Sequence, residues 1–314
     1  MTPTTAAGPA ATTPRPLTGL PAGLTSRPLT LADAEAVHAA IAAEEVADLG
    51  EAEMTLEDVL SDWQRPSYDI TASTVGVLDG DLLVAYADHS GGDVVYTAVL
   101  PAYQGRGIGT ALAAWLQATA RAAGATRIGT QVPEGSAADR FMRDHGYALR
   151  WTAWDLELPP GRELEARPLP EGYALRDAAP ADHEAAWTLL EDCFLEWSDR
   201  ARVSLDDFGA RVWGRPGAEP WNLRLLHAPD GTLVGATHVH LAGDAAYVAK
   251  VAVRPDHRGR GLAPAMLVDA FGLARAHGAE RCYLSTDTRA GARGLYERVG
   301  MEVASTWVNR ALTL

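Results

Sequence analysis

Hydrophobic residues follow two periods along the chain, and the clearest example joins a strand to a helix. Residues 247–253, YVAKVAV, are apolar enough for a buried strand. After a short loop, Met266, Leu267, Ala270 and Ala274 recur at the spacing of one helix face. This pattern predicts a buried strand, a tight loop and a helix in succession.

The predicted elements come in the same order in both halves of the chain. Each half begins with a short strand and alanine-rich helical segments. Two strands then meet at an Asp-Gly dipeptide, Asp79-Gly80 or Asp230-Gly231, which favours a hairpin. The apolar strand, the loop and a helix ending at Gly124 or Gly278 follow. A further strand, a short helix and a last strand complete each half, so we expect an α/β fold with a mixed sheet.

Sequence similarity between the halves has a fixed period. Gln104 and Arg258 are 154 positions apart, and the same interval separates Gly124 from Gly278. The neighbouring residues match as well, since GATR at 124–127 corresponds to GAER at 278–281. This period is far longer than a solenoid repeat and equals a domain length, so the chain is a tandem duplication.

A glycine-rich loop lies between the predicted strand and helix of each half. The first N–H groups of a helix have no partner within it, and small residues let an anion approach them. Arg258 and Arg260 add full positive charges in the second loop. We therefore expect both loops to bind a phosphate group. Their residues are Gln104, Gly105, Arg106, Gly107, Ile108 and Gly109, and Arg258, Gly259, Arg260, Gly261, Leu262 and Ala263.

Composition and charge restrict the classes of function. A chain of 314 residues, with 47% hydrophobic and 22% charged residues, is typical of two globular domains. Its net charge of −14 argues against nucleic acid as a partner. Cys193 and Cys282 lack the spacing of a disulfide framework or a metal site, which fits a reducing cytoplasm. No apolar run reaches membrane-spanning length and no secretion signal is evident, so we expect a cytoplasmic protein without a membrane partner.

Two segments are poor in residues that form a core. Residues 1–25 are mostly Thr, Ala, Pro and Gly, which predicts a disordered tail. Residues 159–172 are rich in Pro and Gly and are expected to form a linker. The expected domains are therefore residues 26–158 and 173–314. Lysine occurs once, at Lys250, and the pattern assigns it no role.

The strand and loop together resemble the coenzyme A segment of the GNAT superfamily of acyl-CoA-dependent N-acetyltransferases. The resemblance rests on a valine-containing strand, a proline and a six-residue motif in both halves. The motif begins with Gln or Arg, has Gly at its fourth position and ends with Gly or Ala. It implies two tandem GNAT-like domains with acetyl-CoA as the acyl donor and no metal. In the family, the loop amides hold the pyrophosphate and the preceding strand pairs with the pantetheine. The equivalent strand residues here are Val251, Ala252 and Val253, and Thr97, Ala98 and Val99.

The resemblance also implies a catalytic acid. The family's usual acid is a tyrosine in a segment Ala-x-x-Leu-Tyr-Glu, which occurs at 292–297 and assigns Tyr296 to meet the leaving thiolate. Met142 occupies the equivalent position of the first half, and methionine cannot donate that proton. The N-terminal domain is therefore expected to be degenerate and the C-terminal domain catalytic. Arg289 stands where many members carry an asparagine.

The general base is not assigned by the sequence. Many members of the family place a glutamate eleven residues before the first loop residue, where Tyr247 and Asp93 stand here. His238 and His240 lie two residues apart on one face of a predicted strand, although two histidines without a third ligand are typical of ordinary half-buried side chains. Asp287 is a further candidate.

The acceptor pocket of family members is lined partly by the first helices of the domain. These helices contribute Glu196 and Trp197, which with His240 and Tyr247 are the candidate acceptor-binding residues. An acidic and aromatic set suits a cationic amine, while an amphipathic helix with its aromatic side chains in the core explains the same pattern. The expected partner is a small-molecule amine, and the oligomeric state is left open.

Three functions agree with these observations. The first is an N-acetyltransferase that acetylates the primary amine of a small molecule by direct attack on the thioester, with Tyr296 as general acid. The second is that of the mycothiol synthases, tandem members of the superfamily that acetylate a cysteinyl amine; Tyr247, where an acceptor-binding acid is expected, counts against it. The third is a non-catalytic module that binds acyl-CoA or acts as a scaffold.

Overall fold

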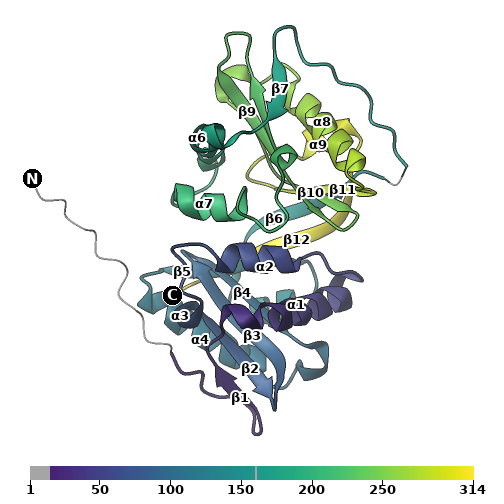
Figure 1. Cartoon of the computed structure of the whole chain (residues 1–314). Helices are drawn as coiled ribbons and strands as arrows, with labels where there is room; N and C mark the ends of the chain where they lie inside the picture. Colours follow the sequence, from purple (N-terminus) through teal and green to yellow (C-terminus); the bar gives the residue numbers. More distant parts are fainter. Residues whose placement is uncertain (1–14, 160) are drawn as a thin grey trace, which may run out of the picture. The chain divides into compact units, whose positions relative to one another are not determined.

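The computed structural model of the chain describes residues 15–159 and 161–314 (Figure 1). Residues 1–14, which fall in the tail that we expect to be disordered, and Pro160 in the expected linker lie outside the described residues. Residues 15–25 are described, and the carbonyl oxygen of Arg15 accepts a hydrogen bond from Trp115 Nε1 at 2.9 Å.

The structure confirms the α/β class with a mixed sheet, and contacts divide the chain into two compact units. The first unit comprises the described residues up to Val59, together with Ser67–Ile128 and Thr313–Leu314. The second unit comprises Leu60–Pro66 and Gly129–Leu312. The units are therefore assembled from segments that are not continuous in the sequence.

The first half of the chain contains five helices and six strands among the described residues. The helices are α1 (Ala34–Leu49), α2 (Leu56–Trp63), α3 (Ile70–Ser73), α4 (Ile108–Ala122) and α5 (Ala137–Asp144). The strands are β1 (Thr25–Arg27), β2 (Thr74–Asp79), β3 (Leu82–Gly91), β4 (Val94–Val99), β5 (Arg127–Pro133) and β6 (Ala148–Glu157). Within the first unit, β1, β2, β3 and β4 pair in this order, and each pair is antiparallel.

The second half repeats this order of elements. Its helices are α6 (His183–Leu195), α7 (Leu205–Arg211), α8 (Leu262–Ala276) and α9 (Arg293–Val299). Its strands are β7 (Ala174–Asp177), β8 (Leu223–His227), β9 (Leu233–Ala242), β10 (Ala245–Val253), β11 (Arg281–Asp287) and β12 (Glu302–Thr313). The two predicted hairpins are confirmed, with Gly80 at φ 58° between β2 and β3 and Gly231 at φ 84° between β8 and β9.

The sheet of the second unit includes a strand from the first half of the chain. Its strand order is β12-β6-β11-β10-β9-β8-β7, so β6 lies between β11 and β12 and pairs antiparallel with both. The pair β10–β11 is parallel. Because β6 ends at Glu157, a chain that begins at residue 159 would lack a central strand of this sheet.

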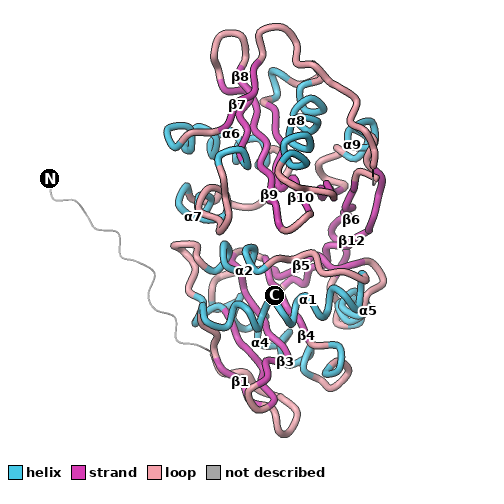
Figure 2. Tube along the Cα trace, turned by 45° about the vertical axis from the view of Figure 1, so that its right-hand side comes forward, coloured by secondary structure: helices cyan, strands magenta, loops and turns pink. Residues whose placement is uncertain are grey.

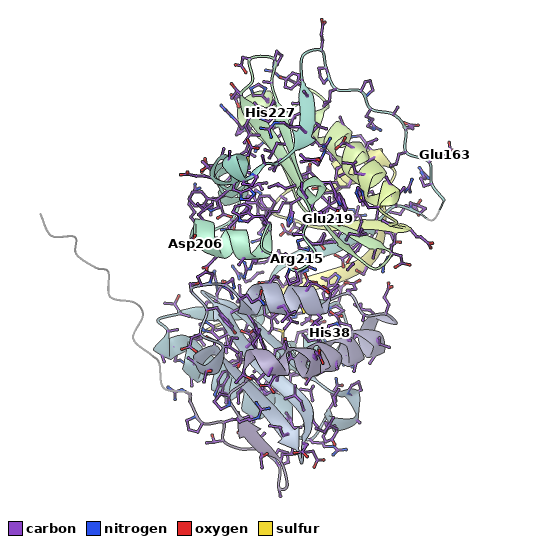
Figure 3. The ribbon with its side chains drawn as sticks, viewed as in Figure 1. His38, Glu163, Asp206, Arg215, Glu219 and His227 are labelled. Atoms are coloured by element: carbon purple, nitrogen blue, oxygen red, sulfur yellow. The ribbon has the colours of Figure 1, made fainter. Side chains whose placement is uncertain are left out.

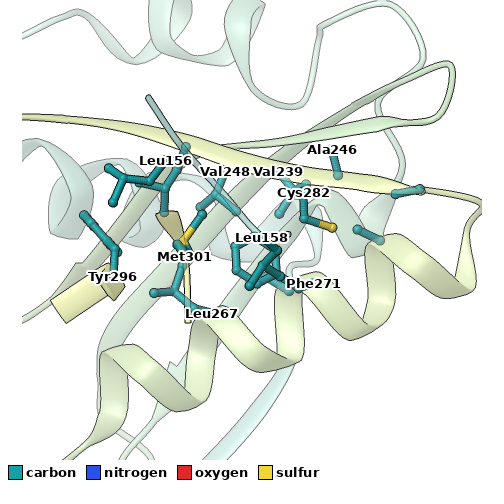
Figure 4. Close-up of a cluster of buried hydrophobic side chains, with 14 of the residues drawn as sticks. Leu156, Leu158, Val239, Ala246, Val248, Leu267, Phe271, Cys282, Tyr296 and Met301 are labelled. Atoms are coloured by element: carbon teal, nitrogen blue, oxygen red, sulfur yellow. The ribbon is translucent and has the colours of Figure 1, made fainter. Parts of the chain in front are cut away.

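Helices cover both faces of this sheet (Figures 1 and 2). On one face α8 and α9 pack over a core that includes Leu156, Val248, Leu267, Phe271 and Tyr296 (Figure 4). On the other face α6 and α7 pack over a second core, as described below. The side chains of this part are drawn in Figure 3, where Asp206 marks the first turn of α7 and His227 the end of β8.

The core of the α6 and α7 face contains apolar residues from both helices and from the sheet. Leu190 of α6 and Phe208 of α7 are 0% and 3% exposed, and both belong to the same cluster as Leu225 and Ala236 of the sheet. Trp187 and Trp213 also pack against this cluster. This packing places α6 directly over the strands that form the site.

Candidate active site

The site begins where two neighbouring strands diverge. The parallel pairing of β10 with β11 extends from Ala245 with Arg281 to Tyr247 with Tyr283, while β10 continues to Val253 and β11 to Asp287. A cavity of about 640 Å³ occupies the space between the diverging ends. Its walls include residues 248–253 of β10, the glycine loop that follows, the end of α6, residues 284–287 of β11, and α9.

The glycine loop forms one end of this cavity. Gly259 and Gly261 have φ values of 75° and 76°, which glycine adopts without the strain that a side chain would add. A Cβ at either position would meet no atom within 4 Å, so the space beside the loop is open. Among the described residues, no backbone N–H group of residues 259–263 donates a hydrogen bond. The loop and the N-terminus of α8 thus present a row of free donors with the positive end of the helix dipole.

The two arginines of this loop bind other parts of the protein. Arg258 forms a bidentate ion pair with Glu196 at the end of α6, with both N–O distances at 2.7 Å. Its Nε also donates to the carbonyl oxygen of Val253, at 2.9 Å. Arg260 donates to the hydroxyl of Tyr173 at 3.0 Å and to a backbone carbonyl of the loop. Arg258 therefore ties the loop to the ends of β10 and α6, and its charge is balanced by Glu196.

Tyr296 lies on α9 in the wall of the cavity. Its side chain belongs to the same core cluster as Leu267 and Phe271 of α8, and the residue is 8% exposed (Figure 4). Burial raises the pKa of its hydroxyl to about 12. Within the part of the chain that the structure describes, this hydroxyl makes no hydrogen bond. The site therefore contains one buried phenol that stays protonated at neutral pH.

The four candidate acceptor-binding residues fall into two groups. Glu196 and Trp197 line the cavity, at the end of α6. His240 and Tyr247 are opposite one another on β9 and β10, with ring centroids 6.1 Å apart. These two residues lie at the closed end of the diverging strands and are not among the described residues that line the cavity.

Of the candidates for the base, Asp287 is engaged in hydrogen bonds and His238 is buried. The Asp287 carboxylate accepts hydrogen bonds from the side chain and backbone N–H of Arg289 and from the backbone of Ala290. The Arg289 guanidinium also lies 3.4 Å from the ring centroid of Trp151. His238 is 2% exposed on β9, and burial lowers the pKa of its imidazole well below the usual value.

Lys250 is a cavity residue that the sequence pattern did not single out. Its ammonium nitrogen lies 5.0 Å from the ring centroid of Phe194 and 5.8 Å from that of Phe208. Burial lowers the pKa of this amine to about 8. One feature of the sequence could have indicated Lys250. It is the one lysine of the chain, and it interrupts an apolar strand beside the predicted loop.

The glycine loop of the first half has the same backbone form. Gly105 and Gly107 have φ values of 71° and 90°, and among the described residues no backbone N–H group of residues 105–109 donates a hydrogen bond. Gln104 replaces the arginine and donates to the carbonyl oxygen of Val99 at 3.2 Å. It also approaches the carboxylate of Glu44, whose pKa burial raises to about 7.

The first half lacks a hydroxyl where the second has Tyr296. Met142 on α5 occupies the equivalent position and is 6% exposed, so its side chain is part of the hydrophobic core. Elsewhere, no group of three or more His, Cys, Asp or Glu side chains within residues 15–159 and 161–314 is placed to hold a metal ion. None of the described helices is both long and apolar enough to span a membrane.

Comparisons with known proteins agree with the geometry of both halves. The family model of the acetyltransferase (GNAT) family matches residues 41–147 and 183–301. The chain is 31% identical over 263 residues to the mycothiol acetyltransferase of Salinispora arenicola (strain CNS-205), which covers 80% of this chain and 83% of that protein.

Solved structures give the same result. A GCN5-related N-acetyltransferase from Sphaerobacter thermophilus superposes with a TM-score of 0.72 at 28% identity, over 94% of this chain and 96% of the other. A tandem GNAT protein from the clavulanic acid biosynthesis pathway has a TM-score of 0.69 at 19% identity, over 92% and 98%. Members of the matched family use acyl-CoA as donor. The chain therefore belongs to the acetyltransferase (GNAT) family as a tandem protein, and it is an acyltransferase.

Proposed function

We propose that the second half of the chain transfers an acetyl group from acetyl-CoA to the primary amine of a small molecule. The observation that carries this proposal is the position of Tyr296 in a cavity that ends at a row of free backbone donors. Five consecutive N–H groups at residues 259–263 suit the pyrophosphate of the coenzyme. The free edge of β10 at residues 248–253 suits the amide groups of the pantetheine.

The reaction asks three things of this site. The amine nitrogen attacks the thioester carbonyl carbon, the carbon–sulfur bond breaks, and the sulfur takes a proton as it leaves. Tyr296 is the proposed donor of that proton because its hydroxyl is protonated at neutral pH and has no other partner among the described residues. A thiol has a pKa of about 8.5 in water, below that of this phenol. The desolvation that raises the pKa of Tyr296 also disfavours a thiolate in the same cavity, which reduces this mismatch.

The proposed roles of the two halves differ. The second half has both the loop and the tyrosine, so we assign catalysis to residues 173–314 with the support of β6. The first half has the loop and Met142, so we assign it coenzyme binding without turnover. Residues 26–158 and 173–314 remain our proposal for the evolutionary domains, with residues 159–172 as the linker.

A specific observation supports a second candidate for the acceptor. The relative from Salinispora arenicola is a mycothiol acetyltransferase, and its similarity extends over 80% of this chain. The same acceptor is therefore the alternative to a different small amine. The sequence at Tyr247 speaks for a different amine, because a neutral phenol stands where an acidic side chain is expected in such enzymes.

A screen of acceptors tests the proposed function. The full chain is incubated with acetyl-CoA and each of a panel of primary amines that includes the mycothiol precursor, and thiol release and acetylated product are both measured. We expect amine-dependent thiol release that gives one acetylated product per thiol. Tight binding of acetyl-CoA without turnover of any amine would support the non-catalytic module instead.

A further inference from the structure

The titratable groups in the cavity wall are almost all engaged. Glu196 is bound to Arg258, and Asp287 is bound to Arg289. The Nδ1 atom of His257 is hydrogen-bonded to the hydroxyl of Tyr173, at 2.9 Å. The thiol of Cys193 is 6% exposed, and burial raises its pKa, so it is protonated at neutral pH. Among the described residues of the cavity wall, these contacts leave Lys250, Tyr296 and Arg298 without such a partner, and of these only the guanidinium of Arg298 stays charged throughout the neutral pH range.

Lys250 reaches the α6 face of the sheet because of an irregularity in β10. The register between β10 and β9 shifts between Val248 and Lys250, which leaves Ala249 as a bulge. The bulge pairs Lys250 with His238 and directs its side chain toward Phe194 of α6 and Phe208 of α7. Within the described residues, the Lys250 amine makes neither a hydrogen bond nor an ion pair. It therefore has a free lone pair whenever it is neutral.

The charged groups around Lys250 come from each element packed against it. Glu191 of α6 favours the ammonium form, but its carboxylate is bound by Arg200 at 2.6 Å and accepts from the backbone of Val203. Arg200 and Arg211 both disfavour the ammonium form. His238, the cross-strand neighbour, is buried and neutral. Burial is the largest cause and the pKa of Lys250 is about 8, so roughly a tenth of the amine is neutral at pH 7 and about half at pH 8.

We propose that Lys250 is the general base of the acetyl transfer, which rests on the proposed function of this cavity. The Nζ atom takes one proton from the ammonium group of the acceptor. The freed nitrogen lone pair forms the bond to the thioester carbon, the carbon–sulfur bond breaks, and Tyr296 gives its proton to the sulfur. The nitrogen bonded to the acetyl group gives up its second proton as the carbon–sulfur bond breaks, and this proton restores the hydroxyl of Tyr296. Lys250 loses its proton to solvent, so one proton is released for each amide formed.

The pH dependence of turnover tests this role. A base must be neutral to act, so kcat/KM of the wild-type chain should rise as the pH increases through about 8. Two acceptors with different amine pKa values are compared. A rise of kcat/KM with pH that occurs at the same pH for both acceptors reflects a group of the enzyme, and we call it the common limb of the pH profile. We expect Lys250→Met to remove this common limb and to lower kcat by roughly a hundred-fold or more. Lys250→Arg keeps a cation over the aromatic rings but stays protonated, so we expect it to be as inactive as Lys250→Met.

Two further variants make the result specific. Arg211→Met removes a cation that holds the Lys250 pKa down, from a side chain outside the cavity, so it should move the common limb to higher pH. Lys250→Ala should regain activity with added tertiary amines, which accept a proton but cannot form an amide. Full activity and an unchanged common limb in Lys250→Met would overturn the proposal. Stoichiometric acetylation of Lys250 by acetyl-CoA without loss of turnover would also overturn it, because an amide nitrogen is not a base.

Failure of the Lys250 assignment can be distinguished from failure of the proposed acetyltransferase function. Binding of acetyl-CoA and formation of any acetylated amine are measured on the same wild-type sample. If product forms and Lys250→Met behaves as wild type, the base assignment fails and the proposed function stands. If no amine is acetylated by the wild-type chain while acetyl-CoA binds, the proposed function fails first, and the base assignment falls with it.

Discussion

Tyr247 and Tyr283 are the last residues that pair β10 with β11, and their ring centroids lie 5.0 Å apart. Beyond this pair the two strands continue without a shared ladder, and the cavity opens between them. The closed end of the strands is thus packed with aromatic side chains, while the open end leads to the glycine loop. This arrangement gives an extended ligand a strand edge along its length and backbone donors at one end.

The first prediction concerns backbone access at Gly261. Gly261→Val adds a side chain at φ 76° beside the free N–H groups, so we expect the affinity for acetyl-CoA to fall roughly tenfold or more. Gly278→Val is the matched control, because Gly278 has φ 99° and open space at the other end of α8. The control carries similar backbone strain, about 1–2 kcal/mol, without approaching the loop. Calorimetry on both full-length variants gives the comparison, and equal losses of affinity would refute the loop assignment.

The second prediction concerns the loop of the first half. The free N–H groups at residues 105–109 support coenzyme binding there as well, so the full chain should bind two molecules of acetyl-CoA. Gly107→Val should reduce the stoichiometry to one and leave kcat nearly unchanged. If turnover fell with Gly107→Val as steeply as with Gly261→Val, the assignment of catalysis to the second half would be wrong.

The third prediction separates two roles for Glu196. Its carboxylate holds Arg258, which in turn holds the carbonyl of Val253, so we expect Glu196→Gln to loosen the loop. The KM for acetyl-CoA should rise several-fold, while the KM for the acceptor should change little. An ion pair this exposed contributes about 1 kcal/mol or less to stability, so the variant should remain folded. A rise confined to the KM of the acceptor would instead support acceptor binding by Glu196.

The fourth prediction concerns stability and pH. The pKa of Lys250 is about 8 in the folded protein against an ordinary value of 10.5, so between these values the unfolded chain binds more protons. The free energy of unfolding contributed by this residue therefore rises with pH from 8 to 10.5, and the buried ammonium is most unfavourable below pH 8. Lys250→Met should raise the free energy of unfolding at pH 7 by up to about 3 kcal/mol.

Denaturant unfolding at several pH values measures this effect. The gain of Lys250→Met over the wild type should shrink as the pH increases from 8 to 10.5. Lys250→Arg, which stays charged throughout this range, should show no gain at pH 7. A gain that is constant with pH would mean that the pKa of Lys250 is not lowered by the fold.

Much of the fold follows from local patterns. Asp-Gly turns placed the hairpins, and the spacing of Met266, Leu267, Ala270 and Ala274 placed α8, where these four residues are buried. The glycine loops were predicted because free N–H groups and positive φ values depend on a few neighbouring residues. The position of Tyr296 in the cavity agrees with the family resemblance, while its role remains a prediction.

The features that the sequence did not indicate depend on long-range contacts. The strand β6 pairs with β11 and β12, although other strand edges could also accept it. The residues of β6 do not indicate which strands it pairs with. The ion pair of Arg258 with Glu196 joins residues 62 positions apart. Lys250 acquires its low pKa from α6 and α7, so an isolated lysine in a strand pattern carries no sign of it.

We have proposed that the second half transfers acetyl groups with Tyr296 as the acid. Tyr296→Phe keeps the ring in its core position and removes only the hydroxyl, so packing and the loop are preserved. We expect kcat and kcat/KM for the acceptor found in the screen to fall together by roughly a hundred- to ten-thousand-fold, with the dissociation constant of acetyl-CoA nearly unchanged. Full turnover by Tyr296→Phe at every pH tested would contradict the assignment of Tyr296 as the acid.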